Sequence, residues 1–166
     1  MFAAQPRRYL ATTCTALRRP VFSERWLATE VTGRLRQDAA SFDFVVQAYC
    51  LMPDHLHVLL EATSERADLL ASMTRFKQTT GVSYRQQTKR QLWQPGYHER
   101  RLRDEEASDA VARYVLENPV RAGLTNALGE YRFAWSDVYG LEGLLTAWEE
   151  TPLCRARRDG FRTRSG

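Results

Sequence analysis

Strand-like and helix-like segments alternate along the 166-residue sequence, and their order restricts how the chain can pack. Alternating apolar residues with many β-branched and aromatic side chains are typical of strands, whereas apolar residues three and four apart are typical of helices. By these criteria we predict strands at residues 8–17, 42–50, 55–61 and 92–102. We predict helices at residues 23–39, 69–87 and 104–118.

The predicted order, β-α-β-β-α-β followed by α, is that of the ferredoxin-like (RRM-like) split βαβ arrangement. In this α+β fold two helices cover one face of an antiparallel sheet, which leaves the other face free for the extra helix. A Met-Pro-Asp turn at 52–54 joins the second and third strands as a hairpin. The chain length and the 43% hydrophobic content suit one domain, at 1–150, followed by a basic tail at 151–166.

Local signals give provisional boundaries for these segments. Ser23 and Asp104 are candidate N-caps for the first and last helices, and Pro119 is expected to end the last one. Pro95 and Gly96 predict a bend in the fourth strand. The predicted apolar face of the first helix consists of Trp26, Leu27, Val31 and Leu35.

The positive charge of the chain is carried almost entirely by arginine. The sequence has 24 Lys and Arg against 20 Asp and Glu, a net charge of +4, and Lys77 and Lys89 are the lysines. Guanidinium groups suit bidentate phosphate contacts and stacking on bases. Charge alone does not distinguish nucleic-acid binding from an ordinary solvated surface. The basic residues gather in two clusters, one at Arg100, Arg101 and Arg103 and one that includes Arg155, Arg157 and Arg158.

Neither membrane insertion nor a disulfide framework is indicated. No window approaches the roughly 18 consecutive apolar residues of a membrane span, and arginines interrupt the N-terminus where a signal peptide is apolar. We therefore expect a soluble cytoplasmic protein. Cys14, Cys50 and Cys154 are odd in number, far apart and without a Cys-x-x-Cys pair, so we expect reduced thiols rather than disulfides or a structural zinc site.

His55 and His57 flank one leucine at the start of the third predicted strand. Successive side chains of a strand point to opposite faces, so the imidazoles share one face while Leu56, Val58 and Leu60 face the core. Their Cα atoms are roughly 7 Å apart, close enough for both rings to bind one metal ion. Taken alone, the pair favours two hydrogen-bonded or solvated histidines, and a metal site needs a further ligand.

The last predicted helix carries two candidates that complete such a site. Tyr114 and Asn118 are four residues apart and hence on one helical face. Asn118 could offer an amide oxygen to Mg²⁺ or Mn²⁺, and Tyr114 a phenolic oxygen as nucleophile. Each has a structural alternative, because Tyr114 could be a core aromatic and Asn118 could cap the helix before Pro119. With the histidine pair, they suit phosphodiester transesterification.

The segments "YCLMPDHLHVLLE" and "ARYVLENPVRAGL" resemble the HUH-type single-tyrosine transposases of insertion sequences, and most closely their REP-associated tyrosine transposase branch. The resemblance runs from about residue 8 to "WSDVYG" and includes "LWQPGYHERRLRD". By matching motif positions, it implies that His55, His57 and Asn118 bind a divalent ion, Mg²⁺ or Mn²⁺, and that Tyr114 is the catalytic nucleophile. Insertion-sequence members commonly have Gln at the position of Asn118, so Asn favours the REP-associated branch.

The resemblance also implies a substrate, single-stranded DNA in REP-type palindromic hairpins, and a 5′-phosphotyrosine intermediate. Arginines would contact phosphates and exposed aromatics would stack on unpaired bases, although Trp93 and Tyr97 could instead pack on the sheet edge. His98 is expected at the surface. The residues expected to contact DNA are Arg100, Arg101, Arg103, Arg121, Trp93, Tyr97, Arg155, Arg157 and Arg158.

Two other functions compete with DNA strand transfer. A non-cleaving hairpin-binding descendant of a transposase needs none of His55, His57, Tyr114 and Asn118, so the presence of all four favours activity. A metal-dependent hydrolase of another fold would need further acidic or histidine ligands, and His98 is the remaining histidine. The resemblance favours a monomer, as in the REP-associated branch, over the dimers common among insertion-sequence relatives.

Overall fold

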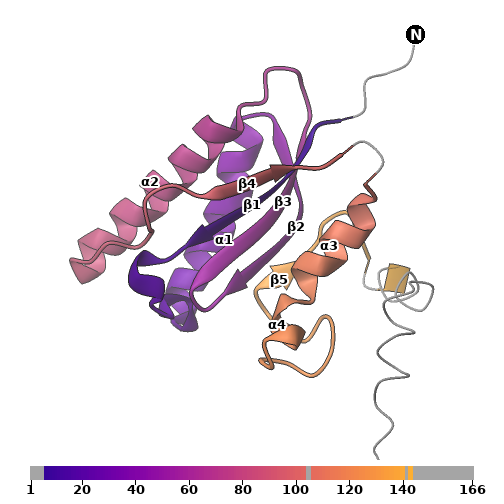
Figure 1. Ribbon diagram of the computed structural model, residues 1–166. Helices are drawn as coiled ribbons and strands as arrows, with labels where there is room; N and C mark the ends of the chain where they lie inside the picture. Colours follow the sequence, from indigo (N-terminus) through magenta and orange to yellow (C-terminus); the bar gives the residue numbers. More distant parts are fainter. Residues whose placement is uncertain (1–5, 104–105, 141, 144–166) are drawn as a thin grey trace, which may run out of the picture.

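The computed structural model describes residues 6–103, 106–140 and 142–143 (Figure 1). Cys154 and the predicted basic tail, with Arg155, Arg157 and Arg158, lie outside these residues. The strands of the described part are β1 (Arg8–Cys14), β2 (Phe44–Met52), β3 (His55–Ala62), β4 (His98–Arg101) and β5 (Ala134–Trp135). Its helices are α1 (Arg25–Ser41), α2 (Leu69–Thr88), α3 (Ser108–Leu116) and α4 (Asn118–Arg121), with 3₁₀ turns η1 (Ala16–Arg18) and η2 (Val21–Ser23).

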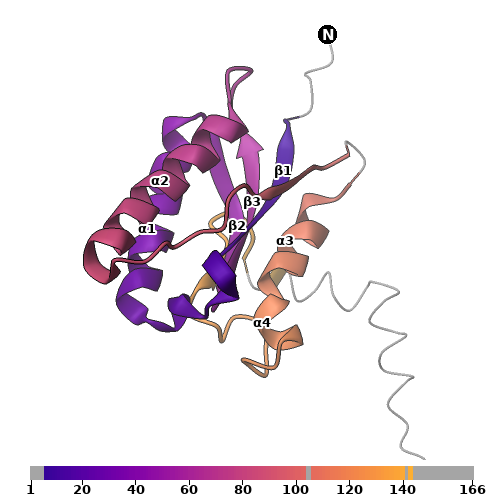
Figure 2. The ribbon, with the colours of Figure 1, turned by 60° about the vertical axis from the view of Figure 1, so that its left-hand side comes forward.

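The strands form one antiparallel sheet in the order β4-β1-β3-β2-β5. The first four strands have the split βαβ order, which confirms the fold predicted from the sequence. Helices α1 and α2 cover one face of the sheet, and α3 and α4 lie on the other (Figures 1 and 2). The two-residue strand β5 was not predicted; it extends the sheet beside β2 by pairing Trp135 with Tyr49.

Both faces of the central strands are buried, in two separate cores. Leu56, Val58 and Leu60 of β3 belong to the larger core with α1 and α2, as predicted. Leu59 belongs to a smaller core that also contains residues of α3. Because side chains alternate along a strand, the odd-numbered residues of β3 face α3. The alternation therefore places both histidines of β3 on the α3 side of the sheet.

The start and apolar face of α1 differ from the prediction. The helix begins at Arg25, while Ser23 lies in η2, and no side chain caps the helix. Trp26 is 39% exposed, because consecutive helical residues point about 100° apart and the buried stripe runs through the next position. That stripe contains Leu27, Val31 and Leu35.

The remaining boundaries agree in part with the predictions. α2 runs through Gly81 without a break and is capped by Asp68, whose carboxylate accepts a hydrogen bond from the Ala71 amide. Gly96 has φ +70°, which forms the predicted bend. α3 begins at Ser108, and Asp104 lies outside the described residues.

Pro119 is predicted from the sequence to end the last helix, but it lies inside a further helical turn. It occupies the first turn of the short helix α4, where its missing N–H removes no hydrogen bond. Cys14 and Cys50 are free thiols in the described part. None of the helices in the described part is both long and apolar enough to cross a membrane.

Candidate functional site

His55 and His57 lie together at the start of β3, immediately after the turn from β2. Their Nε2 atoms are 3.1 Å apart, and the ring centroids are 4.7 Å apart with the planes at 87°. Both rings are partly buried. The two side chains therefore converge on one point, as the shared strand face predicted.

The outer nitrogen of each ring is held by a neighbouring side chain. Asp54 Oδ1 lies 2.6 Å from His55 Nδ1, and Thr12 Oγ1 lies 2.8 Å from His57 Nδ1. Asp54 in turn forms an ion pair with Arg18, at 3.0 Å. A carboxylate only accepts hydrogen bonds, so His55 donates from Nδ1, and the neutral form of the ring then has its lone pair on Nε2, facing the site.

His57 is kept neutral by its surroundings. Burial is the largest cause that lowers its pKa to about 4, and the neighbouring His55 ring and the positive charges of Arg121 and Arg18 lower it further. Near pH 7 the ring therefore has one free nitrogen lone pair, which is the form that binds metals. The Thr12 hydroxyl can accept or donate, so it permits His57 to place that lone pair on Nε2.

This donor set fits a divalent ion. Two neighbouring nitrogen ligands, each about 2.1 Å from one ion, lie roughly 3 Å apart, close to the separation of the two Nε2 atoms. Within the described residues, no third His, Cys, Asp or Glu joins them in a metal-binding cluster. Any further ligand from the described part is therefore of another type, such as the amide expected at Asn118.

Tyr114 lies on α3 beside the histidine pair. Its ring centroid is 6.4 Å from that of His57, with the planes at 69°. The side chain is 44% exposed, so the alternative of a core aromatic is wrong. The packing of α3 on β2 and β3 therefore brings the predicted nucleophile to the predicted metal-binding pair, 57 positions away in the sequence from His57.

Arg121 lies directly over the ring of Tyr114. Its guanidinium carbon is 4.2 Å from the ring centroid, and Nη2 donates to the Tyr114 carbonyl at 3.1 Å. The same Nη2 donates to Asn118 Oδ1, at 3.3 Å. In this structure Arg121 therefore contacts the predicted nucleophile and the candidate third ligand, a role that its sequence position alone did not reveal.

Asn118 is both a helix cap and a candidate ligand. Its Nδ2 donates to the carbonyls of Tyr114 and Val115, both at 3.1 Å, and so satisfies the C-terminal end of α3. The capping role foreseen as an alternative is thus present. Capping uses the amide nitrogen of Asn118. The amide oxygen, which is the atom that would bind a metal, accepts a hydrogen bond from Arg121 instead.

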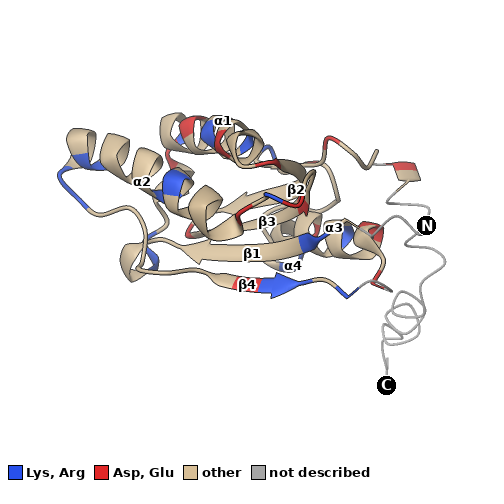
Figure 3. Cartoon of the chain, turned by 90° about the horizontal axis from the view of Figure 1, so that it is seen from above, with Lys and Arg blue, Asp and Glu red and all other residues tan. Residues whose placement is uncertain are grey.

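A hollow of about 360 Å³ adjoins Tyr114. It shares Arg100 and Glu106 with a second hollow of about 660 Å³, which Arg101 and Arg103 also line. All three arginines are exposed, and in Figure 3 those of β4 form a blue stretch along an outer edge of the sheet. Glu106 pairs with Arg100 at 2.6 Å, so this basic surface also carries acidic side chains. The first hollow is lined by Leu10, Arg100, Glu106, Ala110, Val111 and Tyr114.

Trp93 and Tyr97, for which packing on the sheet edge was the alternative to stacking on DNA bases, both pack against the larger core. Trp93 is 5% exposed, packs against Phe22 and Phe76, and donates from its indole to Thr80 Oγ1 at 2.9 Å. Its ring is covered by these neighbours and is not available to stack on a base. Tyr97 is partly buried against the same core, and its hydroxyl donates to Glu99. His98 is exposed, as expected.

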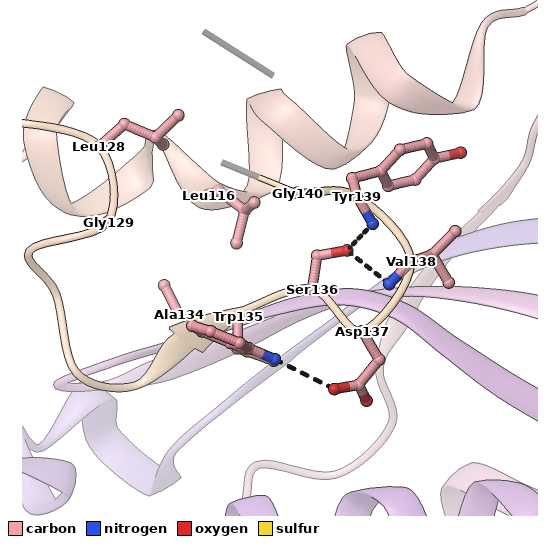
Figure 4. A pocket seen from close by; sticks show the side chains of 10 residues that line it. All are labelled: Leu116, Leu128, Gly129, Ala134, Trp135, Ser136, Asp137, Val138, Tyr139 and Gly140. Atoms are coloured by element: carbon pink, nitrogen blue, oxygen red, sulfur yellow. Dashed lines mark hydrogen bonds between the residues drawn. The ribbon is translucent and has the colours of Figure 1, made fainter. Parts of the chain in front are cut away.

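A separate pocket of about 180 Å³ lies between α3 and β5 (Figure 4). The Trp135 indole donates to Asp137 there, and Ser136 Oγ accepts hydrogen bonds from the amides of Val138 and Tyr139. None of the predicted site residues lines this pocket. The lining consists of Leu116, Leu128, Gly129, Ala134, Trp135, Ser136, Asp137, Val138, Tyr139 and Gly140.

Sequence reasoning missed three residues that support the histidine pair. Asp54 was read as a turn residue, although its position directly before His55 was a usable signal. Thr12 reaches His57 because β1 pairs with β3, with Thr12 opposite His57. Arg18 reaches Asp54 from the loop after β1. Nothing local in the sequence indicated either of these two contacts.

The chain is similar to known transposases in sequence and in fold. The family model described as "Transposase IS200 like" matches residues 7–118. No curated protein gives a significant match. The fold is similar to that of a REP-associated tyrosine transposase solved with a REP hairpin, with a TM-score of 0.64, 14% identity and coverage of 86% of this chain and 93% of that chain. It is also similar to a candidate transposase from Deinococcus radiodurans R1, with a TM-score of 0.51, 22% identity and coverage of 71% and 94%.

The family match spans well over half of the chain. It includes β1 to β4, the histidine pair, and α3 with Tyr114 as far as Asn118. This agrees with the resemblance seen in the motifs around the histidines and the tyrosine. The chain therefore belongs to the IS200-like transposase family.

Proposed function

We propose that this transposase is a metal-dependent single-stranded DNA endonuclease and strand-transferase that forms a 5′-phosphotyrosine intermediate. The observation that carries the proposal is the contact of the exposed Tyr114 ring with His57, beside the converging histidine nitrogens. A hydroxyl nucleophile, a candidate metal-binding pair and a basic surface are then gathered in one place. This combination suits transesterification of a phosphodiester.

His55 and His57 would hold the ion through Nε2, and Asn118 Oδ1 is the proposed third protein ligand. Mg²⁺ or Mn²⁺ suits a site of imidazole and amide ligands with open positions. When bound, the ion supplies charge neutralisation and orientation of the scissile phosphate. The Asp54 and Thr12 contacts orient the two rings, as partners of metal-bound histidines generally do.

In the proposed cleavage, the Tyr114 hydroxyl attacks phosphorus, and the bond between phosphorus and the 3′-oxygen breaks. The tyrosine proton passes to solvent or a base, and the departing 3′-oxygen takes up a proton to become a 3′-OH. Attack by the same or another 3′-OH on the phosphotyrosine reverses the exchange, so strands are joined without an external energy source. The Arg121 guanidinium over the ring stabilises the negative charge that develops on the phenolic oxygen.

We propose REP-type palindromic hairpins as substrate. The asparagine at position 118 and the fold shared with a transposase solved on a REP hairpin support this choice. Arg100, Arg101 and Arg103 lie on the surface that leads to Tyr114, where they can hold the phosphates of a bound strand. Such a protein would act in the cytoplasm, on the DNA of the nucleoid.

We also propose that the protein acts as a monomer. Tyr114 and His57 of the same chain are already in contact, so one chain can supply both nucleophile and metal-binding pair. A second copy of the chain is not needed to bring Tyr114 together with His55 and His57.

The test is incubation with labelled single-stranded REP-type hairpins and Mg²⁺ or Mn²⁺, followed by denaturing electrophoresis. A covalent protein–DNA band that is lost on chelation is the expected result. Hairpin binding without any covalent band would instead identify a non-cleaving DNA-binding protein. A covalent band that persists with chelator would contradict the metal site.

A further inference from the structure

The loop after β1 presents a leucine to solvent at the border of the candidate site. Leu17, in η1, is 84% exposed, more than any other large hydrophobic residue of the described part. A single exposed leucine is ordinary and carries no information by itself. Leu17, however, combines its exposure with an unfavourable backbone conformation.

Leu17 and Arg18 both adopt the left-handed conformation, with φ of 58° and 54°. This conformation is unfavourable for residues that have a Cβ, and glycine would adopt it without that cost. Residues held in such conformations concentrate at functional sites, where the surrounding structure enforces them. The leucine side chain therefore stands at a position where glycine would serve the fold better.

The neighbours of Leu17 hold the loop in place. The Thr15 hydroxyl contacts the carbonyls of Arg19 and Asp54, at 2.8 and 3.1 Å. The Ala16 amide donates to the Leu92 carbonyl at 2.8 Å, and Arg19 Nη2 donates to the Gln91 carbonyl at 2.9 Å. The Leu17 side chain belongs to neither hydrophobic core. Hydrogen bonds to the segments around Asp54 and Leu92 therefore hold the loop in place, and none of them involves the Leu17 side chain.

The same loop is linked to the histidine pair. Arg18 contacts Asp54, and Asp54 holds the ring of His55, at 3.0 and 2.6 Å. The views in Figures 1 and 2 place this loop and α4 at the same end of the molecule. A DNA strand that crosses the histidines and Tyr114 would therefore pass close to Leu17.

We propose that Leu17 packs against an unpaired base of the single-stranded DNA next to the scissile phosphate. The inference rests on the proposed function, because it requires DNA at the histidine site. Apolar side chains that insert beside bases unstack them and hold the nucleic acid in a bent or splayed form. Since the loop is already fixed in the free protein, little ordering of the leucine is needed when DNA binds.

The decisive variant is Leu17→Gly, for which fold stability and DNA binding should change in different directions. Relief of the left-handed strain should leave the melting temperature equal to or above that of the wild type. Affinity for the hairpin that the wild type cleaves should fall about tenfold, from loss of the apolar contact. A 2-aminopurine base beside the cleavage site should brighten with wild-type protein and stay quenched with Leu17→Gly.

Three further variants distinguish the effect of the Leu17 side chain from that of the backbone conformation at this position. Leu17→Ala keeps a Cβ and should reproduce the loss of affinity, whereas Leu17→Met should retain most of it. Leu70→Ala is the matched control, since Leu70 is 66% exposed on α2, on the other side of the sheet, and its loss should leave DNA binding unchanged.

Several results would overturn the inference. A lower melting temperature for Leu17→Gly would show that the Leu17 side chain stabilises the fold by packing. An altered oligomeric state with intact DNA binding would show that Leu17 contacts another protein chain. If the wild type cleaves hairpins and Leu17→Ala binds and cleaves equally well, Leu17 has no role while the proposed function stands. If the wild type neither binds nor cleaves, both fall together.

Discussion

Arg121 bridges Tyr114 and Asn118: its guanidinium lies 4.2 Å from the tyrosine ring centroid, and its Nη2 donates to the asparagine Oδ1 at 3.3 Å. One cation thus contacts both the proposed nucleophile and the proposed third ligand. It also contributes to lowering the pKa of His57. Arg121 of α4 thus ties the end of α3 to α4, and Tyr114 of α3 contacts His57.

Replacement of Arg121 by Ala should slow single-turnover cleavage about tenfold while hairpin affinity changes much less. The physical reason is that the guanidinium orients the nucleophile and stabilises its developing charge. Lys in its place should restore part of the rate, because it keeps the charge but not the paired hydrogen bonds. Arg132→Ala is the control, as Arg132 lies 5.9 Å over the Phe133 ring. If Arg121→Ala lowered hairpin affinity as much as the cleavage rate, Arg121 would be a DNA contact and not a residue that assists Tyr114.

Tyr114→Phe should abolish both cleavage and the covalent adduct while hairpin binding stays largely intact, because the substitution removes only the attacking oxygen. Gel shift and denaturing electrophoresis on the same hairpin measure the two properties. Tyr97→Phe loses a hydroxyl bonded to Glu99 and should still form the adduct. An adduct formed by Tyr114→Phe would disprove the choice of nucleophile.

Asp54→Asn should weaken the apparent affinity for Mn²⁺ by about 10-fold to 100-fold, because the carboxylate fixes the His55 ring and its tautomer. Thr12→Val should act in the same direction through His57. The measurement is the Mn²⁺ concentration at half-maximal cleavage rate. Asp43→Asn, which alters a carboxylate bonded to Ser64, serves as control. Unchanged Mn²⁺ dependence in both variants would argue against the proposed site.

Mixing Tyr114→Phe protein with a His55→Ala, His57→Ala double variant should yield no covalent adduct. Each chain would have to use its own tyrosine and its own histidines, as the contact between Tyr114 and His57 indicates. Recovered adduct formation in the mixture would show that two chains share active sites, as a dimer.

Trp93→Ala should lower the free energy of unfolding by about 3–5 kcal/mol, because it empties a buried space between Phe22 and Phe76 and leaves Thr80 without its indole partner. Urea denaturation provides the measurement. Trp26→Ala, at an exposed position, should cost less than about 1 kcal/mol. A stable Trp93→Ala protein with weakened hairpin binding would restore Trp93 as a DNA-stacking residue.

Local pattern was enough to predict the order of the strands and helices and the shared face of His55 and His57. Both follow from the spacing of apolar and polar residues along the chain, and neighbouring residues are enough to define that spacing. The same reasoning placed Trp26 on the buried face, which is wrong, and did not choose between packing and base stacking for Trp93. Whether a large aromatic is covered depends on which segments pack around it, and the residues that cover Trp93 come from η2 and α2.

The chemistry of the site depends on contacts between distant segments. Pairing of β1 with β3 brings Thr12 to His57, and packing of α3 on the sheet brings Tyr114 to the same ring. The bridge from Arg121 to Tyr114 forms because the chain turns from α3 directly into α4. Residue types and spacing nominate the participants, but their distances and hydrogen bonds are set by long-range packing, which no short stretch of sequence encodes.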